Sequence, residues 1–347
     1  MLPERAAGGV RPVVLLARPV PASGAASAAA ATPELRRQAR LQRLRRATQM
    51  GFFALFLVAP ALNLLRFDLT ETQLWVLGFQ WHLGIDDFLQ GKTTATEAAL
   101  AIIGRGMLPA LLLVGGFLAV AWRWGRLYCG WLCPHFSLVE TLNDLLHRAC
   151  GKLSLWDAQP TPRGNRQPQR RWWPVFALSC AVFGFLWAIT LLTYLLPPAT
   201  VWGNLVAGTL TPNQARFIGI GTAVFTAEFL FARHLFCRFG CAVGLFQSLA
   251  WMANPRGLVV AFDRGRARDC RACSTPQSPA GAACDQACPM RLKPRNIKRL
   301  MFSCVQCGQC LTECDASHAQ RAQAPSLEWH VGLDAVRETL RQRREDR

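Results

Sequence analysis

Charged side chains are scarce in this chain. Asp, Glu, Lys and Arg make up 17% of its 347 residues, whereas hydrophobic residues make up 51%. A sequence so poor in charge is too apolar for an ordinary soluble enzyme. We therefore expect part of the chain to lie in lipid.

Acidic residues are the scarcer charged class, since 21 Asp and Glu stand against 39 Lys and Arg and leave a net charge of +18. Such a basic chain suggests nucleic acid as a partner. The arginines, however, gather beside apolar stretches, and nine of them lie in residues 1–47, just before the first such stretch. This is the positive-inside pattern of membrane proteins, so the charge predicts topology and no nucleic-acid partner.

Histidine is also rare, with six residues. A haem inside the membrane needs axial ligands that face it from the spans. His82 lies in an expected outer loop and His234 at an inner end, so we expect no haem. Without a carrier inside the lipid, redox groups of this chain should work on one side of the membrane.

Four stretches are long and apolar enough to cross a bilayer, at about 20 residues per crossing. They are residues 48–65, 99–123, 172–196 and 215–235. The Arg-rich arm 1–47 and the Arg-rich connection 123–171 belong in the cytoplasm. The connections 66–97 and 197–213 are acidic or uncharged and should face outward. The sequence predicts a multi-pass protein of the bacterial inner membrane, with both termini and the redox sites on the cytoplasmic side.

The membrane part, residues 48–254, repeats a cysteine motif. Tyr128-Cys129-Gly-Trp-Leu-Cys133 follows the second stretch, and Phe236-Cys237-Arg-Phe-Gly-Cys241 follows the fourth. The four crossings therefore predict two repeated helical hairpins that deliver two Cys-x3-Cys motifs to one cytoplasmic surface.

Cysteine is abundant, with 14 residues. Twelve of them form Cys-x2-Cys or Cys-x3-Cys pairs, a spacing that favours a metal or cluster over the disulfide framework of a small secreted domain. We interpret the two others, Cys150 and Cys180, as packing residues because cysteine is often buried.

The strongest motif is Cys304-x2-Cys307-x2-Cys310-x3-Cys314, in a region of 255–318 that has no apolar span. Three cysteines at this spacing bind one [4Fe–4S] cluster and the fourth binds the other cluster of a two-cluster ferredoxin. The partner motif, Cys270-x2-Cys273 and Cys284-x3-Cys288, has a ten-residue insertion at 274–283. The tail 319–347 is polar, and we assign it no chemistry.

Exchange of the fourth ligands predicts two ligand sets. One is Cys270, Cys273, Cys284 and Cys314, and the other is Cys288, Cys304, Cys307 and Cys310. Structural zinc is the alternative, but zinc prefers two Cys-x2-Cys pairs, which the run from Cys304 to Cys314 matches poorly. The expected fold is thus an α-helical membrane protein of four transmembrane helices with a C-terminal ferredoxin-like α+β domain of the two-[4Fe–4S] type.

The thiols of Cys129, Cys133, Cys237 and Cys241 are the candidate reactive site at the membrane. Soft thiolates favour Cu(I), iron–sulfur or zinc, and a dithiol near clusters can also cycle through a disulfide. Burial as small packing residues is the alternative. Two further residues are weaker candidates, His135 as a ligand or a solvated side chain, and Glu228 as a proton-handling group or a structural partner of Arg233.

These motifs resemble the membrane polyferredoxin family that includes NapH, NosR and the cbb3 cytochrome oxidase accessory protein CcoG (FixG or RdxA). Arg66-Phe-Asp-Leu, the stretch from Val76 to Phe88, Phe246-Gln-Ser and Cys314-Asp315 resemble the CcoG branch most. The resemblance covers about residues 36–316. Beyond it we expect no counterpart of that branch's C-terminal immunoglobulin-like domain.

The resemblance implies a cupric reductase-like oxidoreductase or electron carrier. Its two clusters would feed Cys129, Cys133, Cys237 and Cys241, where Cu(II) is reduced to Cu(I) during oxidase assembly. Implied partners are a cytoplasmic electron donor or quinol, oxidase assembly factors and a copper transporter. Two alternatives stay open, a NapH-like quinol-to-partner electron conduit and a metal-binding assembly scaffold without redox chemistry.

Overall fold

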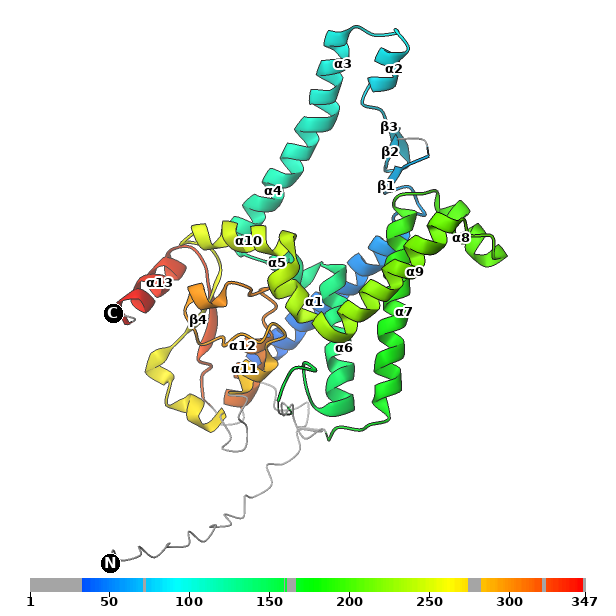
Figure 1. The fold of residues 1–347 in the computed structure, drawn as a ribbon. Helices are drawn as coiled ribbons and strands as arrows, with labels where there is room; N and C mark the ends of the chain where they lie inside the picture. Colours follow the sequence, from blue (N-terminus) through cyan, green and yellow to red (C-terminus); the bar gives the residue numbers. More distant parts are fainter. Residues whose placement is uncertain are drawn as a thin grey trace, which may run out of the picture.

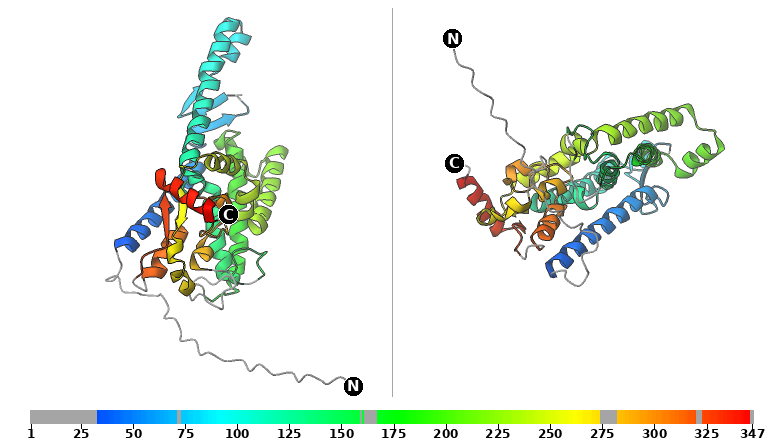
Figure 2. Two further views of the ribbon diagram at one scale, coloured as in Figure 1. Left: turned by 90° about the vertical axis from the view of Figure 1, so that its left-hand side faces the viewer. Right: turned by 90° about the horizontal axis from the view of Figure 1, so that it is seen from below.

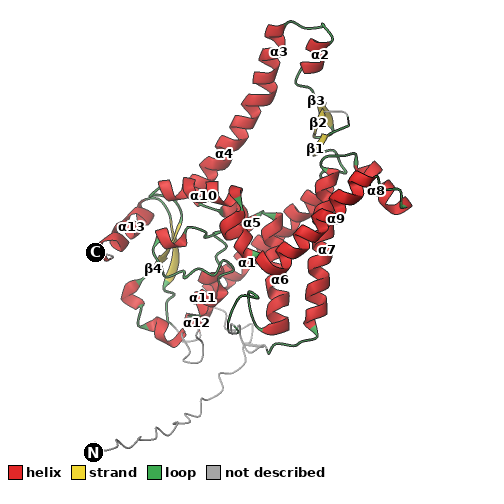
Figure 3. Ribbon diagram, viewed as in Figure 1, coloured by secondary structure: helices red, strands yellow, loops and turns green. Residues whose placement is uncertain are grey.

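The computed structural model describes residues 33–70, 73–158, 160, 167–273, 282–319 and 323–345. Most of the basic arm (1–32) and most of the insertion in the first ferredoxin-type motif (274–281) lie outside the described residues. Helices dominate the described part, accompanied by two small antiparallel sheets (Figure 1; Figure 3).

Three helical segments are long and apolar enough to cross a membrane: Ala95–Trp124, Trp172–Thr193 and Pro212–Ala232. The first joins α3 (Ala95–Ala101), the π-helical turn η1 (Ile102–Met107) and α4 (Leu108–Trp124). The second is α7 (Trp172–Thr193), and the third joins α9 (Pro212–Ala227) to the π-helical turn η2 (Glu228–Ala232). They coincide within a few residues with the second, third and fourth expected crossings.

The first expected crossing, residues 48–65, is not a single helix. α1 (Pro33–Val58) is basic in its first half, and the chain leaves it at a turn that contains Pro60 and Asn63, whose φ is 52°. Proline has no N–H to donate and a positive φ is not helical, so the apolar part of α1 stays short. It packs on α7 instead: the Phe56 and Trp187 ring centroids are 4.7 Å apart. The expected four transmembrane helices are therefore represented by three candidate spans and this shorter helix.

The expected outer loop after α1 forms a small meander. Strands β1 (Leu65–Asp68), β2 (Gln73–Val76) and β3 (Phe79–Trp81) pair in antiparallel order, and α2 (Ile85–Leu89) follows them. The backbone N–H of Phe67 donates to the Tyr194 carbonyl over 2.9 Å. This bond fixes the meander to the end of α7.

The candidate spans do not form one tight bundle. α7 packs chiefly against α9, to which it is joined by α8 (Pro198–Ala207). At their crossing, a Cβ on Gly184 would come 2.6 Å from Thr226 Oγ1, so glycine lets the two backbones approach closely. α3 and α4 stand apart from this pair (Figure 1; Figure 2), and only 6% of that span's apolar window is buried against 44% in α7.

Each half of the membrane part ends in the same local structure. α4 leads to the short α5 (Leu127–Trp131) and then to α6 (Pro134–Cys150). In the second half, η2 leads to the π-helical turn η3 (Phe236–Gly240) and then to α10 (Ala242–Ala253). In each half the first cysteine lies on the short turn and the second cysteine is the residue before the following helix.

The remaining chain builds the ferredoxin-type domain from short elements around one two-stranded sheet. They are β4 (Val259–Phe262), the 3₁₀ turns η4 (Arg264–Arg266), η5 (Asp269–Cys273) and η6 (Lys298–Met301), α11 (Ala283–Ala287), α12 (Gln309–Ala319), β5 (Leu327–His330) and α13 (Leu333–Glu345). β5 pairs antiparallel with β4 and places Trp329 opposite Val260. The polar segment expected to be a tail thus supplies half of the sheet.

Candidate metal centres

Four cysteines surround a pocket that we name the distal pocket. Cys270 and Cys273 come from η5, Cys284 from α11 and Cys314 from α12, and the space between the lining atoms, part of it open to solvent, is about 270 Å³. Backbone N–H groups of Ser326 and Leu327, just before and at the start of β5, hydrogen-bond to the Cys314 thiol. The segment after residue 319 therefore contributes directly to this pocket.

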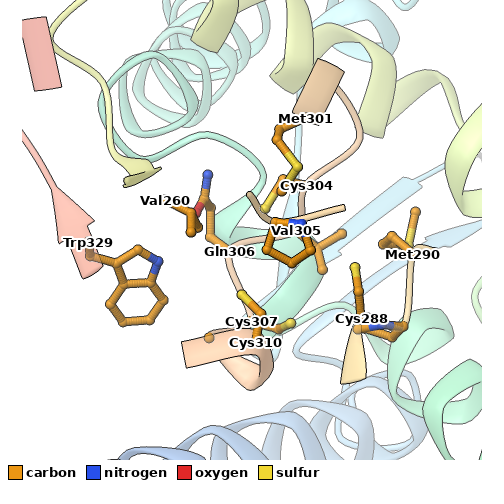
Figure 4. A pocket seen from close by; sticks show the side chains of 13 residues that line it. Val260, Cys288, Met290, Met301, Cys304, Val305, Gln306, Cys307, Cys310 and Trp329 are labelled. Atoms are coloured by element: carbon orange, nitrogen blue, oxygen red, sulfur yellow. The ribbon is translucent and has the colours of Figure 1, made fainter. Parts of the chain in front are cut away.

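Four other cysteines surround the proximal pocket, in which the space between the lining atoms, part of it open to solvent, is about 340 Å³. Figure 4 shows the side chains of Cys288, Cys304, Cys307 and Cys310 around it, with Trp329 at one side. Gln306 and Gly308 have φ values of 53° and 70°, so the 304–310 loop folds back tightly and turns its three cysteines toward the same space.

The two pockets hold the ligand sets that exchange of the fourth cysteine predicts. Cys314 of the second motif lies in the distal pocket, and Cys288 of the first motif lies in the proximal pocket. Cys310 joins the apolar core around the distal pocket while it lines the proximal one, so the pockets are neighbours. The structure brings the eight cysteines together in these sets, and cluster ligation by them stays a prediction.

The donor set fits a [4Fe–4S] cluster in each pocket. Within the described ranges, no three His, Cys, Asp or Glu side chains converge as around a single ion. Each set of thiols instead surrounds a volume, and N–H groups point at the sulfurs, as from Leu292 N to Cys288 Sγ over 3.4 Å. Burial raises the pKa of the Cys284 and Cys304 thiols to about 12, so iron rather than solvent would have to stabilise their thiolates.

The other four paired cysteines also converge, and we name them the four-thiol site: Cys129, Cys133, Cys237 and Cys241. Cys129 and Cys237 are buried in one apolar core and Cys133 packs against it. Burial raises the pKa of Cys129, Cys133 and Cys237, and neighbouring thiols raise it further, because Cys133 acts on Cys237 and Cys241 acts on Cys129 and Cys133. The two repeats therefore meet at this site, as their matching sequences suggest.

A buried arginine borders the four-thiol site. Arg126 is 2% exposed, hydrogen-bonds to the Cys129 thiol, and donates from Nη2 to the Cys237 carbonyl over 2.7 Å. Gly244 leaves room for the guanidinium, because a Cβ there would overlap it. Among the described residues no carboxylate forms an ion pair with Arg126, and its Nε has no hydrogen-bond partner.

The four-thiol site touches the loop of the proximal pocket directly. Gly130, next to Cys129, lies so close to Val305 that a Cβ would overlap the Val305 carbonyl oxygen. Trp131 Nε1 donates to the Gln306 carbonyl over 3.0 Å. Cys129, Cys237, Cys288 and Cys307 share one apolar core. The two sites are therefore contiguous.

The second repeat also contacts the ferredoxin-type domain. Ser248 Oγ donates to the Phe302 carbonyl over 2.8 Å. Lys298 Nζ donates to the carbonyls of Trp251 and Asn254, over 3.0 and 2.6 Å, and burial lowers its pKa to about 8. Both repeats therefore contact residues 298–306.

A polar network that includes side chains of α1 stabilises the contact between the membrane part and the ferredoxin-type domain. Arg45, 1% exposed, makes two hydrogen bonds to the Glu140 carboxylate and one to the Gly130 carbonyl. Gln309 of α12 donates to the same carboxylate over 2.5 Å. Glu140 therefore ties together α1, α6 and the ferredoxin-type domain, a role that the sequence alone did not indicate.

His135 and Glu228 form a pair that sequence analysis did not connect. His135 Nε2 lies 3.0 Å from Glu228 Oε2, and its Nδ1 lies 3.4 Å from Cys237 Sγ. Arg233, the expected partner of Glu228, instead donates to Asn143 Oδ1 and to the carbonyls of Phe229 and Leu230. The position of His135 two residues after Cys133 was the one signal for this contact.

The two unpaired cysteines lie away from these sites. Cys180 is fully buried in the apolar core between α6 and α7. The Cys150 thiol donates to the Leu146 carbonyl over 3.3 Å. Both positions are consistent with packing residues.

Comparison with known proteins points to iron–sulfur chemistry. Residues 107–152 match the family Fer4_5, a 4Fe-4S binding domain. The chain is 23% identical over 222 residues to the "Putative electron transport protein YccM" of Escherichia coli (strain K12), an alignment that covers 60% of this chain and 56% of YccM. It is 21% identical over 215 residues to the uncharacterized protein MJ0749 of Methanocaldococcus jannaschii, covering 61% of this chain and 71% of that protein. No solved structure matches.

The chain thus spans a little more than half the length of YccM. The matches support an iron–sulfur electron-transport family, and three helices are long and apolar enough to cross a membrane.

Proposed function

We propose that this chain is a membrane-bound electron-transfer protein in which the ferredoxin-type domain exchanges electrons with the four-thiol site. The distal and proximal pockets would each hold a [4Fe–4S] cluster, which supplies one-electron chemistry. The positive-inside pattern favours the cytoplasmic face of a bacterial inner membrane for both sites.

The contact of Gly130 with Val305 is the observation that carries this proposal. It joins the residue after Cys129 to the loop between Cys304 and Cys307 without an intervening side chain. Arg126 reinforces the junction, because its charge acts on Cys304 as well as on Cys129 and Cys237. A direct contact between the two sites supports electron exchange between them.

Reduction of Cu(II) to Cu(I) during cbb3-type oxidase maturation is the terminal reaction that the resemblance to the CcoG branch implies. Each Cu(II) would take one electron from the reduced protein.

The test uses full-length protein in lipid nanodiscs, reduced with dithionite and freed of excess reductant without oxygen. Cu(II) is added together with a chelator that reports Cu(I). We expect the Cys129→Ala/Cys237→Ala variant to form Cu(I) at least about tenfold more slowly than wild type, with the spectrum of the ferredoxin-type clusters unchanged. The Cys150→Ala/Cys180→Ala variant, altered only at packing positions, is the matched control. Equal rates in all three proteins would rule the proposal out.

A second candidate function is oxidation of a quinol, and the pair of His135 and Glu228 favours it. The pair is nearly buried, with side chains 12% and 14% exposed, at the end of a candidate span. Trp187, Phe229 and Phe236 surround His135, with ring centroids 5.2 to 6.0 Å away. Glu228 Oε1 is buried without a partner and can accept a hydrogen bond from a quinol hydroxyl. The two electrons would reduce two oxidised clusters, and the two protons would go to water.

This candidate predicts that a short-chain quinol reduces the oxidised clusters in nanodiscs. Glu228→Gln should slow that reduction about tenfold while dithionite still reduces the clusters fully. Glu97→Gln, which changes an exposed carboxylate at the other end of the membrane part, should leave the rate unchanged. Absence of quinol-driven reduction in the wild type excludes the candidate.

A further inference from the structure

The four-thiol site presents its sulfurs to hydrogen-bond donors from several directions. Gln247 Nε2 lies 3.4 Å from Cys129 Sγ, and Gly244 N lies 3.5 Å from Cys241 Sγ. Backbone N–H groups of His135 and Phe136 point at the Cys133 thiol. With His135 Nδ1 near Cys237, each of the four sulfurs faces a nitrogen. Hydrogen bonds to the ligand sulfurs are one of the features by which proteins tune a bound iron–sulfur cluster.

The charges around the site also suit an anionic group. The guanidinium of Arg126 is buried and has an unpartnered Nε. α6 and α10 both begin at the site, since Cys133 and Cys241 are the residues before their first turns. The positive ends of two helix dipoles therefore meet where the thiolates lie. A [4Fe–4S] cluster with four thiolate ligands carries net negative charge, which this environment stabilises.

The four thiols lie close enough to influence one another: Cys133 acts on Cys237, and Cys241 acts on Cys129 and Cys133. Four cysteines from two repeats therefore gather at one place, which is the number of thiolate ligands that a [4Fe–4S] cluster takes.

The family match lies over this site. Residues 107–152, which match a 4Fe-4S binding domain, contain Cys129 and Cys133 and none of the eight cysteines of the ferredoxin-type motifs.

We infer that Cys129, Cys133, Cys237 and Cys241 bind a third [4Fe–4S] cluster at the junction of the two membrane repeats. This inference deepens the proposed function and rests on it, because the third cluster would be the group that exchanges electrons with the proximal pocket. Copper or a disulfide at the same thiols is an outcome of the test below.

The experiment reconstitutes full-length protein with iron and sulfide under anaerobic conditions and measures both per chain. We expect about 12 iron and 12 sulfide in wild type, four of each for every cluster, and about 8 in the Cys129→Ala/Cys237→Ala variant. The Cys150→Ala/Cys180→Ala control should keep the wild-type content. The inference is overturned if wild type holds only about 8 iron per chain, or if the Cys129→Ala/Cys237→Ala variant holds about 12. Stoichiometric copper or a disulfide at the four thiols would overturn it as well.

A second variant keeps the test informative if the first one folds poorly. Replacing Cys270, Cys284, Cys304 and Cys307 with Ala should remove the two ferredoxin-type clusters and leave about 4 iron, visible as one reduced spin system by EPR. If wild type holds about 8 iron per chain and this variant holds none, the third cluster is contradicted and the proposed function still stands. Unchanged iron in this variant would contradict the proposed function itself.

Discussion

Replacing Gly130 with alanine is expected to separate the ferredoxin-type domain from the four-thiol site. The new Cβ overlaps the Val305 carbonyl oxygen, a backbone atom that cannot rotate away, so one backbone segment must shift. Electron transfer slows as the distance between redox groups grows, so electron delivery from the reduced clusters should become measurably slower. Strain of this kind costs about 1–3 kcal/mol of stability.

Stopped-flow absorbance of dithionite-reduced protein mixed with Cu(II) measures this effect. The matched control is Gly116→Ala in α4, where a Cβ meets nothing within 4 Å. That variant should react like wild type. Retention of the wild-type rate in Gly130→Ala, with iron content intact, would mean that electrons do not pass through this contact.

Replacing Glu140 with glutamine should have the largest effect on stability. Arg45 is 1% exposed and makes its ion pair with Glu140 at 2.8 Å, so the substitution leaves a buried cation without its counter-charge. Loss of one partner of a buried pair costs about 3–5 kcal/mol. Because Gln49 and Gln309 donate to the same carboxylate, the joint between α1, α6 and α12 should loosen as a unit.

Thermal unfolding followed by loss of cluster absorbance checks this prediction, and a drop of roughly 10 °C is expected. Asp144→Asn is the control, since it breaks an ion pair with Arg148 whose side chains are 39% and 43% exposed, and such pairs contribute less than about 1 kcal/mol. The double variant Arg45→Met/Glu140→Met should be more stable than Glu140→Gln, because it removes both charges. If Glu140→Gln unfolds at the same temperature as wild type, the network does not hold the domain in place.

Short-range cysteine spacing was the most informative part of the sequence. The geometry of a cubane leaves few ways to arrange Cys-x2-Cys-x2-Cys-x3-Cys, so the grouping of Cys288 with the second motif and Cys314 with the first followed from the motif alone. The repeat of Cys-x3-Cys likewise predicted that Cys129 and Cys237 would lie near each other. Hydropathy located three candidate spans within a few residues because it depends only on composition over about 20 residues.

Contacts between distant segments could not be predicted from the sequence. The closeness of Gly130 to Val305 depends on how two domains dock, and a glycine beside a cysteine is equally compatible with a simple local turn. The sequence left Glu228 open between proton handling and a contact with Arg233, five residues on. In the structure the chain breaks at Arg233, with φ of 32°, and the Arg233 side chain donates to Asn143. The polar segment after residue 319 gave no strand signal, yet β5 forms by pairing with β4.

The central claim is that electrons leave the ferredoxin-type domain through the four-thiol site. Its most direct test is the rate at which the reduced clusters of full-length protein in nanodiscs are reoxidised by Cu(II), followed by stopped-flow absorbance. A fast phase in wild type that slows by about tenfold or more in Cys129→Ala/Cys237→Ala is the predicted result. Reoxidation of that variant at the wild-type rate, with its ferredoxin-type clusters intact, would contradict the claim.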